Sequence, residues 1–181
     1  MALQVQEVVK SALLSSDGRF RYQLTRSWSD VAKMVFVMLN PSTADAETDD
    51  ATIRRCMRFA SREQCGGIVV VNLFAFRTVD PKRLAAEGYP NGPDNISYVA
   101  AALNQAQNAR TPAVMAWGAF DKPWHSEAWR WIMDRDDYDF RCLGTAKDGS
   151  PRHPLYVKGE QPLELWPNAQ PERYPPNVKG K

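Results

Sequence analysis

The residues with the clearest chemical potential follow an apolar run that ends at Leu39. Asn40 and Pro41 come directly after this run, and Ser42 follows them. Because proline restricts the preceding residue to extended conformations, Pro41 would direct the amide of Asn40 out of a strand end. An amide offers both a donor and an acceptor, so it can orient water or bind a planar heterocycle. We take Asn40 as a candidate catalytic residue and Pro41 and Ser42 as substrate-binding candidates; a simple turn is the alternative.

His153 is the second candidate catalytic residue. It is one of two histidines, and Arg152 precedes it in a segment that also contains Lys147. An imidazole there could donate to negative charge that develops on a carbonyl or phosphate. Lys147 and Arg152 make the segment cationic, which suits an anionic ligand, so both are substrate-binding candidates. A surface histidine in a loop is the alternative, and His125 is interpreted as structural.

Aromatic and polar residues also stand at the ends of two other apolar runs. Asn72, Phe74, Phe76 and Arg77 follow one run, and Trp117 closes another. Aromatic rings at a strand end can stack on a nucleobase, and arginine can bind phosphate. These five residues complete the predicted substrate-binding set, although core packing is the commoner fate of a phenylalanine.

Four carboxylates lie within six residues after Ala44, at Asp45, Glu47, Asp49 and Asp50. Oxygen ligands of this kind could hold Mg²⁺ for phosphate chemistry. The alternative is that they cap and stabilise the N-terminus of the following helix, and this is the interpretation that we favour. No metal site is therefore predicted.

The pattern of apolar residues predicts the elements that must position these side chains. Strands are expected at 34–39, 68–71, 113–117 and 140–143, with helices between them that begin near residues 50, 95 and 124. The segment 19–26 after Asp17-Gly18 predicts an additional antiparallel strand or hairpin. Strands that alternate with helices predict a three-layer α/β sandwich with a mostly parallel, four-stranded central sheet. Ligands of such sheets bind outside the carboxyl ends of the strands, where the candidate residues fall.

Composition limits the remaining possibilities. The chain has 181 residues, of which 44% are hydrophobic. This length and composition fit one folded domain at 1–165 and a proline-rich tail at 166–181. The net charge of +2 gives no strong overall attraction to nucleic acid. We expect no membrane span and no secretory signal. Three scattered cysteines exclude a disulfide framework and a four-cysteine iron–sulfur cluster, so a cytoplasmic protein without a cofactor is expected. Nucleotide-hydrolase, dinucleotide-binding and hydrolase-elbow motifs are absent.

Four phrases of the sequence resemble one known family. They are Val37–Asp45 (VMLNPSTAD), Val71–Arg77 (VNLFAFR), Ala116–Gly118 (AWG) and the segment Cys142–Tyr156 with its Arg152-His153-Pro154. Over about residues 19–157 the chain resembles the bacterial and phage domain-of-unknown-function family 1643. This resemblance implies no activity, because the family is defined without one.

A more distant similarity is to the uracil-DNA glycosylase-like superfamily, whose fold is a four-stranded parallel sheet between helices. In its mismatch-specific members an Asn-Pro after the first strand positions the attacking water, and Asn40-Pro41 matches it. A His-Pro after the last strand steadies the departing base, and His153-Pro154 matches it. The similarity implies an N-glycosylase-like hydrolase that recognises a nucleobase in nucleic acid or a nucleotide derivative. A non-catalytic module that binds a nucleotide or nucleic acid, and Mg²⁺-dependent phosphate chemistry at Asp45–Asp50, remain alternatives.

Overall fold

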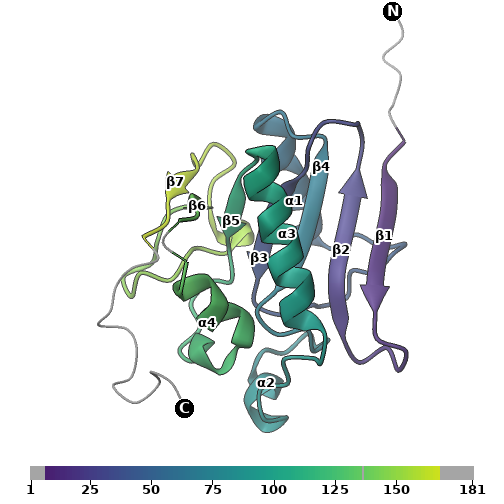
Figure 1. The fold of residues 1–181 in the computed structure, drawn as a ribbon, viewed down its shortest axis with the longest axis vertical. Coiled ribbons are helices and arrows are strands. Elements are labelled where there is room, and N and C mark those ends of the chain that lie inside the picture. Colours follow the sequence, from purple (N-terminus) through teal and green to yellow (C-terminus); the bar gives the residue numbers. More distant parts are fainter. Residues whose placement is uncertain (1–6, 136, 168–181) are drawn as a thin grey trace, which may run out of the picture.

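A computed structural model describes residues 7–135 and 137–167, and these form one seven-stranded sheet with helices on both faces (Figure 1). The strands are β1 (Val9–Leu14), β2 (Arg21–Ser27), β3 (Met34–Met38), β4 (Gly67–Asn72), β5 (Ala113–Met115), β6 (Phe140–Cys142) and β7 (Glu164–Leu165). The helices are α1 (Ala51–Arg62), α2 (Lys82–Ala86), α3 (Asn95–Ala109) and α4 (Glu127–Met133), with 3₁₀ turns η1 (Pro123–His125) and η2 (Pro154–Tyr156).

The strand order is β1-β2-β4-β3-β5-β6-β7. The central strands β4, β3, β5 and β6 pair in parallel, whereas β2 and β1 extend one edge and β7 the other as antiparallel strands. The expected α/β class and the antiparallel strand expected at 19–26, which is β2, are confirmed. The sheet is larger than the four strands expected, because three antiparallel strands flank its parallel part.

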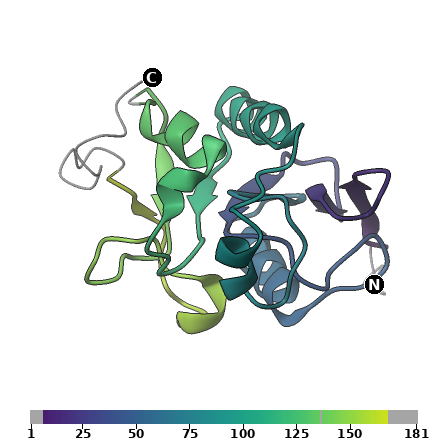
Figure 2. The same ribbon diagram turned by 90° about the horizontal axis from the view of Figure 1, so that it is seen from below.

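The two faces of the sheet are covered by different helices, with α3 and α4 on one side and α1 and η2 on the other (Figure 2). Alternate residues of β3 serve the two layers. Val35 and Val37 pack in the core cluster of α3 and α4, while Met34 and Phe36 pack in the cluster of α1. This double burial explains why β3 is an unbroken apolar run.

The start of α1 follows from its capping residue. The side chain of Asp50 accepts a hydrogen bond from the backbone N–H of Ile53 at 2.8 Å, which satisfies one of the free donors of the first helical turn. The sequence predicted this acidic helix start. It did not predict the five-residue helix α2, nor the pairing of β1 and β7 at the sheet edges.

The outer segments show two further features. The pairing of β1 with β2 shifts register between Leu13 and Leu14, as in a β-bulge. Trp166, assigned from the sequence to the tail, is buried, and its ring lies edge-on to Trp117 with centroids 5.1 Å apart. The rest of the predicted tail, from residue 168, lies outside the described residues.

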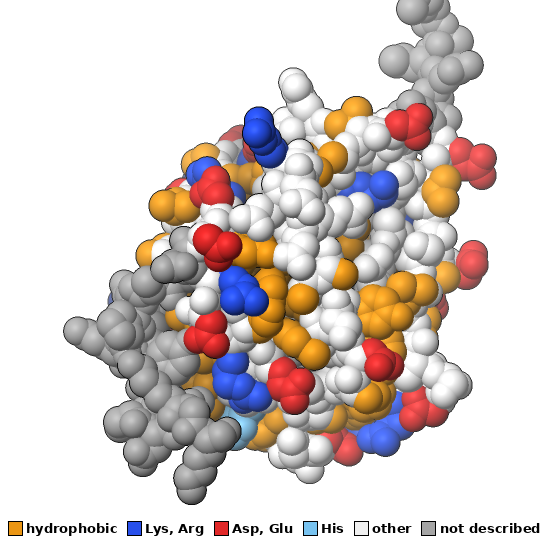
Figure 3. Space-filling model, viewed as in Figure 1, with side chains coloured by type: hydrophobic (Ala, Val, Ile, Leu, Met, Phe, Trp, Pro, Cys, Tyr) orange, Lys and Arg blue, Asp and Glu red, His pale blue; other side chains and the backbone are white. Residues whose placement is uncertain are grey.

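Charge on the surface is mixed. Over the face covered by α3 and α4, acidic and basic side chains are interspersed, and no large field of one sign gathers there (Figure 3). Among the described residues, no helix combines the length and apolar character that crossing a bilayer requires.

Candidate functional site

A cavity of about 620 Å³ opens at the carboxyl ends of the parallel strands. We call this cavity the edge cavity. Figure 2 views the molecule from the side on which this edge of the sheet lies. The walls of the cavity come from the residues after β3, β4 and β5, from the start of α1, and from the segment between β6 and η2. Such a crevice is where open parallel sheets place ligands.

Six of the eleven residues predicted to form the site line the edge cavity. They are Asn40, Ser42, Asn72, Trp117, Arg152 and His153. Asn40 and His153 are 113 positions apart in the sequence, and the fold brings both into one cavity. Their proposed roles in catalysis stay predictions.

The amide of Asn40 is held by its own surroundings. Its Nδ2 donates to the carbonyl oxygen of Thr78 at 2.8 Å and to that of Pro41 at 3.0 Å. Both amide hydrogens are therefore used inside the protein. The sequence suggested a donor and an acceptor at this position, but the structure leaves Oδ1 as the group with which Asn40 can meet a ligand, as an acceptor.

Asn72, at the end of β4, has the opposite character. Its side chain is 1% exposed, and neither Nδ2 nor Oδ1 has a hydrogen-bond partner among the described groups. Its backbone carbonyl accepts a hydrogen bond from Nδ2 of Asn95 at 2.9 Å, so the chain around it is fixed. An unsatisfied buried polar group costs about 1–3 kcal/mol. This cost is explained if the amide is reserved for a ligand.

His153 is held as a neutral hydrogen-bond donor. Burial lowers the pKa of its imidazole below the usual 6.5, and the carboxylate of Asp50 only partly offsets this. Its Nδ1 accepts from the backbone N–H of Leu155 at 3.3 Å. The proton of the neutral ring therefore resides on Nε2, which donates to no group of the described residues.

Two contacts fix the position of the His153 segment. Gly118 has φ of +79°, and a Cβ there would lie 3.3 Å from Cβ of His153, so the backbone after β5 approaches this segment as only glycine allows. From α1, Arg55 donates to the carbonyl oxygens of Pro154 and Val157. The histidine is thus anchored between β5 and α1.

The predicted aromatic stacking residues lie elsewhere. Phe74 is fully buried, with ring centroids 6.1 Å from Tyr89 and 5.9 Å from Phe120, and Phe76 packs against Phe20 at 6.4 Å. Neither ring lines the edge cavity. Both serve the core, the commoner use of phenylalanine.

The aromatic rings that do line the cavity are Trp117, Phe120 and Tyr156. The sequence pointed to Trp117 alone, because Phe120 stands in an irregular segment and Tyr156 in the three-residue 3₁₀ turn η2, which is too short to show periodicity.

Three further predicted residues also lie outside the cavity lining. Pro41 is buried, and its carbonyl oxygen accepts from the backbone N–H of Thr78 at 2.9 Å. Arg77 donates from Nη1 to the carbonyl oxygen of Gly18 at 3.2 Å. Lys147 is exposed in a turn next to Ala146, which does line the cavity. Pro41 therefore has a structural place, and Lys147 lies near the cavity rather than in it.

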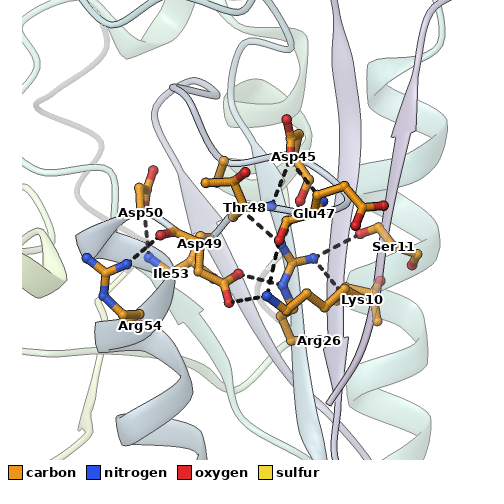
Figure 4. A network of polar contacts seen from close by, with 12 residues as sticks. Lys10, Ser11, Arg26, Asp45, Glu47, Thr48, Asp49, Asp50, Ile53 and Arg54 are labelled. Atoms are coloured by element: carbon orange, nitrogen blue, oxygen red, sulfur yellow. Dashed lines mark hydrogen bonds and ion pairs between the residues drawn. The ribbon is translucent and has the colours of Figure 1, made fainter. Parts of the chain in front are cut away.

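The acidic segment Asp45–Asp50 is organised by contacts within the protein (Figure 4). Asp49 pairs with Nε of Arg26 at 2.6 Å and with Nζ of Lys10 at 3.0 Å. Asp45 accepts from the backbone N–H groups of Glu47 and Thr48 at 2.9 and 2.8 Å. No three metal-ligating side chains of the described residues group together. The segment therefore has a structural explanation.

These contacts set the charge of the segment. Burial by itself would raise the pKa of Asp49, but hydrogen bonds from Arg26 and Lys10 outweigh it, so the pKa lies below the usual 3.8. Backbone hydrogen bonds from Thr48 and Glu47 likewise lower the pKa of Asp45. Both side chains are anionic at neutral pH.

Two charged residues of the cavity were not predicted. Arg21 lines it from the start of β2, and Asp50 lines it from the start of α1. Asp50 was interpreted from the sequence as part of a helix start, which it is, with Mg²⁺ binding as the alternative. A signal for Arg21 existed in principle, because a charged residue within a strand that has buried positions needs a specific reason.

The sequence matches the model of one protein family, described as protein of unknown function DUF1643, over residues 21–155. The chain belongs to the DUF1643 family. The match begins at Arg21 and ends at Leu155, so among the cavity-lining residues only Tyr156 falls outside the matched part of this DUF1643 chain. The chain gives no significant match to any curated protein or to any solved structure. The resemblance to the uracil-DNA glycosylase-like fold therefore stays a prediction.

Proposed function

We propose that this DUF1643 protein binds a nucleobase in the edge cavity and hydrolyses the bond that joins the base to its sugar. One observation carries the proposal: Asn40, Asn72 and His153 line one cavity, and the buried amide of Asn72 has no partner among the described groups. The parallel strands between two helical layers are also compatible with the uracil-DNA glycosylase-like similarity of the sequence.

Recognition of the base would rest on Asn72. A carboxamide presents a donor and an acceptor side by side, and this pair complements the adjacent donor and acceptor on the edge of a base. Trp117 and Phe120 supply aromatic surface in the same cavity for stacking. Because Asn72 is buried and fixed through Asn95, it would discriminate strongly against ligands that leave it unpaired.

The chemistry would be divided between two faces of the base–sugar bond. Oδ1 of Asn40 would accept a hydrogen bond from a water molecule and so orient this water towards the anomeric carbon. As the water oxygen bonds to that carbon, the carbon–nitrogen bond breaks and its electron pair passes to the base. His153 Nε2–H would donate a hydrogen bond to the developing anion, and the carboxylate of Asp50, in the same cavity, can take the proton released by water.

The charge of the protein bears on the substrate. The protein has a net charge of +2, and the face in Figure 3 carries charges of both signs. It therefore has little of the positive field that attracts duplex DNA. A base in a duplex would also have to leave its stack to reach the cavity. A nucleotide derivative or a single-stranded nucleic acid therefore fits better than duplex DNA.

The test is base release, measured by chromatography. The substrates are nucleosides, nucleotides, and single- and double-stranded DNA that contains uracil or other modified bases. We expect release by the native protein and a loss of about 10²-fold or more in Asn40→Ala and His153→Ala. Arg83→Ala, at an exposed arginine of α2 outside the cavity, is the control and should retain activity. Absence of release from every substrate, with all variants folded, overturns the hydrolase. Ligand-dependent thermal stabilisation without release would instead identify a binding module.

A further inference from the structure

Two arginines of β2 are buried but are satisfied to very different degrees. Arg26 is 0% exposed, pairs with Asp49 and donates to four backbone carbonyl oxygens. Arg21 is 3% exposed, and with the described residues its guanidinium makes one hydrogen bond, from Nη1 to the carbonyl oxygen of Ala44 at 2.5 Å. Its Nε is buried without a partner among the described groups. Arg26 shows what this fold provides when a buried arginine is structural.

The charge of Arg21 is also uncompensated at short range. No described carboxylate forms an ion pair with it within 4.0 Å. At longer range Asp50 and Asp45 attract it, while Arg77 and Arg26 repel it. Burial lowers the pKa of the guanidinium to about 10, so it remains positively charged at neutral pH. A buried cation of this kind is costly unless a counter-charge arrives.

The position of Arg21 supplies the route for that counter-charge. Its side chain lines the edge cavity together with the buried residues Met38, Val70 and Asn72. Asp50 lines the same cavity but commits Oδ1 to the N–H of Ile53. The cavity thus contains a guanidinium with free donors and an amide with free donor and acceptor. A guanidinium fork matches the paired oxygens of a phosphate or carboxylate.

Building on the proposed function, we propose that Arg21 binds an oxyanion, a phosphate or a carboxylate, carried by the ligand of the edge cavity. The substrate is then an anionic derivative, such as a nucleoside monophosphate or a carboxylated base, rather than a neutral nucleoside. The oxyanion would take up the unpartnered donors of Arg21 while the base edge pairs with Asn72. Arg21 is not among the residues to which the sequence assigned phosphate binding, which are Arg77, Lys147 and Arg152, and of these only Arg152 shares its cavity.

The test compares charged and neutral ligands that share a base. Thermal unfolding and calorimetric titration of the full chain are followed with uridine and uridine monophosphate, adenosine and adenosine monophosphate, uracil and orotate, and inorganic phosphate. The variants are Arg21→Met, which removes the charge, and Arg21→Lys, which keeps the charge but not the fork. Arg83→Met, an exposed arginine outside the cavity, is the control for net charge.

We expect the native protein and Arg83→Met to bind at least one charged member at least tenfold more tightly than its neutral counterpart. Arg21→Met should lose this preference, and Arg21→Lys should retain part of it. Preference for the monophosphates identifies a phosphate, and preference for orotate a carboxylate. If Arg21→Met does not fold, the Arg21→Lys comparison decides.

The outcomes separate this inference from the proposed function. Equal binding of charged and neutral partners by the native protein, or an unchanged preference in the Arg21 variants, overturns the oxyanion subsite and leaves nucleobase binding standing. Binding of phosphate without any base-containing ligand, lost in Arg21→Met, supports the subsite and overturns nucleobase recognition. Binding of no ligand at all overturns both.

Discussion

The side-chain amide of Asn95 donates to the backbone carbonyl of Asn72 at 2.9 Å, while the side-chain amide of Asn72 itself bonds to nothing in the described protein. The two asparagines are equally buried. Asn95 holds the end of β4 in place, and Asn72 is the residue at that end of β4. Nδ2 of Asn95 therefore has a structural partner, whereas the amide of Asn72 is the one that we propose for ligand binding.

Replacing Asn72 by leucine, which has a similar shape, is therefore expected to stabilise the fold. The change removes two buried polar groups that lack partners, a gain of about 1–2 kcal/mol. For a chain of this size that corresponds to a rise in Tm of about 2–6 °C, measured by thermal unfolding. Ligand binding should be lost at the same time, a trade of function for stability.

Asn95→Leu is the matched control for that experiment. It removes two buried hydrogen bonds, to the carbonyl oxygens of Asn72 and Leu73, and this loss outweighs the removal of its own unpartnered Oδ1, so Tm should fall. A fall in Tm for Asn72→Leu as well would show that its amide has a structural partner.

Asp49→Asn is expected to destabilise the protein by about 3 kcal/mol at pH 7, because it leaves the buried guanidinium of Arg26 without its carboxylate. The pKa of Asp49 is lower in the folded than in the unfolded chain. Its contribution is therefore complete above pH 4 and is lost as pH falls through the folded pKa. Urea unfolding from pH 2.5 to 7 should show the native and variant curves converging at the acid end. A constant difference across this range would contradict the assignment.

Gly118→Ala is expected to cost about 1–2 kcal/mol, because φ at this position is +79°. It should also displace His153, since the new Cβ would lie 3.3 Å from Cβ of that residue. Gly88→Ala provides the control, with φ of +75° and nothing within 4 Å. Both variants should lose similar stability in thermal unfolding, but only Gly118→Ala should lose ligand binding or base release. Equal function in the two would separate Gly118 from the site.

Because of the imidazole of His153, the free energy of unfolding is expected to depend on pH in the mildly acidic range. Its pKa is lower in the folded protein than in the unfolded chain, so the unfolded chain binds more protons once pH falls below about 6.5. The free energy of unfolding should then fall by up to about 1.4 kcal/mol per pH unit until the folded pKa is reached. Urea unfolding of native protein and His153→Asn between pH 8 and 5 should show that the variant lacks this component. Parallel curves would contradict the neutral state of the half-buried His153.

The parallel part of the sheet could be predicted because its strands are buried on both faces. Residues such as Val35 and Phe36 form unbroken apolar runs, and a capping Asp50 marks where α1 begins. β1 could not be predicted in this way, since its residues are mostly exposed and lack alternation. β7 has only two residues, too few for any period to show.

The site was predictable in location but less so in composition. Chain order places Asn40 and Asn72 at strand ends, whatever their roles. Arg21 and Arg26 differ in whether a carboxylate pairs with them. Asp49, which lies 23 residues from Arg26 in the sequence, pairs with Arg26 and not with Arg21. Likewise, whether Phe74 faces the cavity or the core depends on how Tyr89 and Phe120 pack, which spacing does not encode.

The register shift between Leu13 and Leu14 has a consequence for the behaviour of the protein at high concentration. β1 is the outer strand at one edge of the sheet and exposes the apolar side chains of Val9 and Leu13. The free backbone edge of such a strand could pair with a strand of another molecule. A bulge bends and twists such an edge, and Lys10 adds a charge to it. We therefore expect the irregular end of β1 to disfavour intermolecular sheet growth.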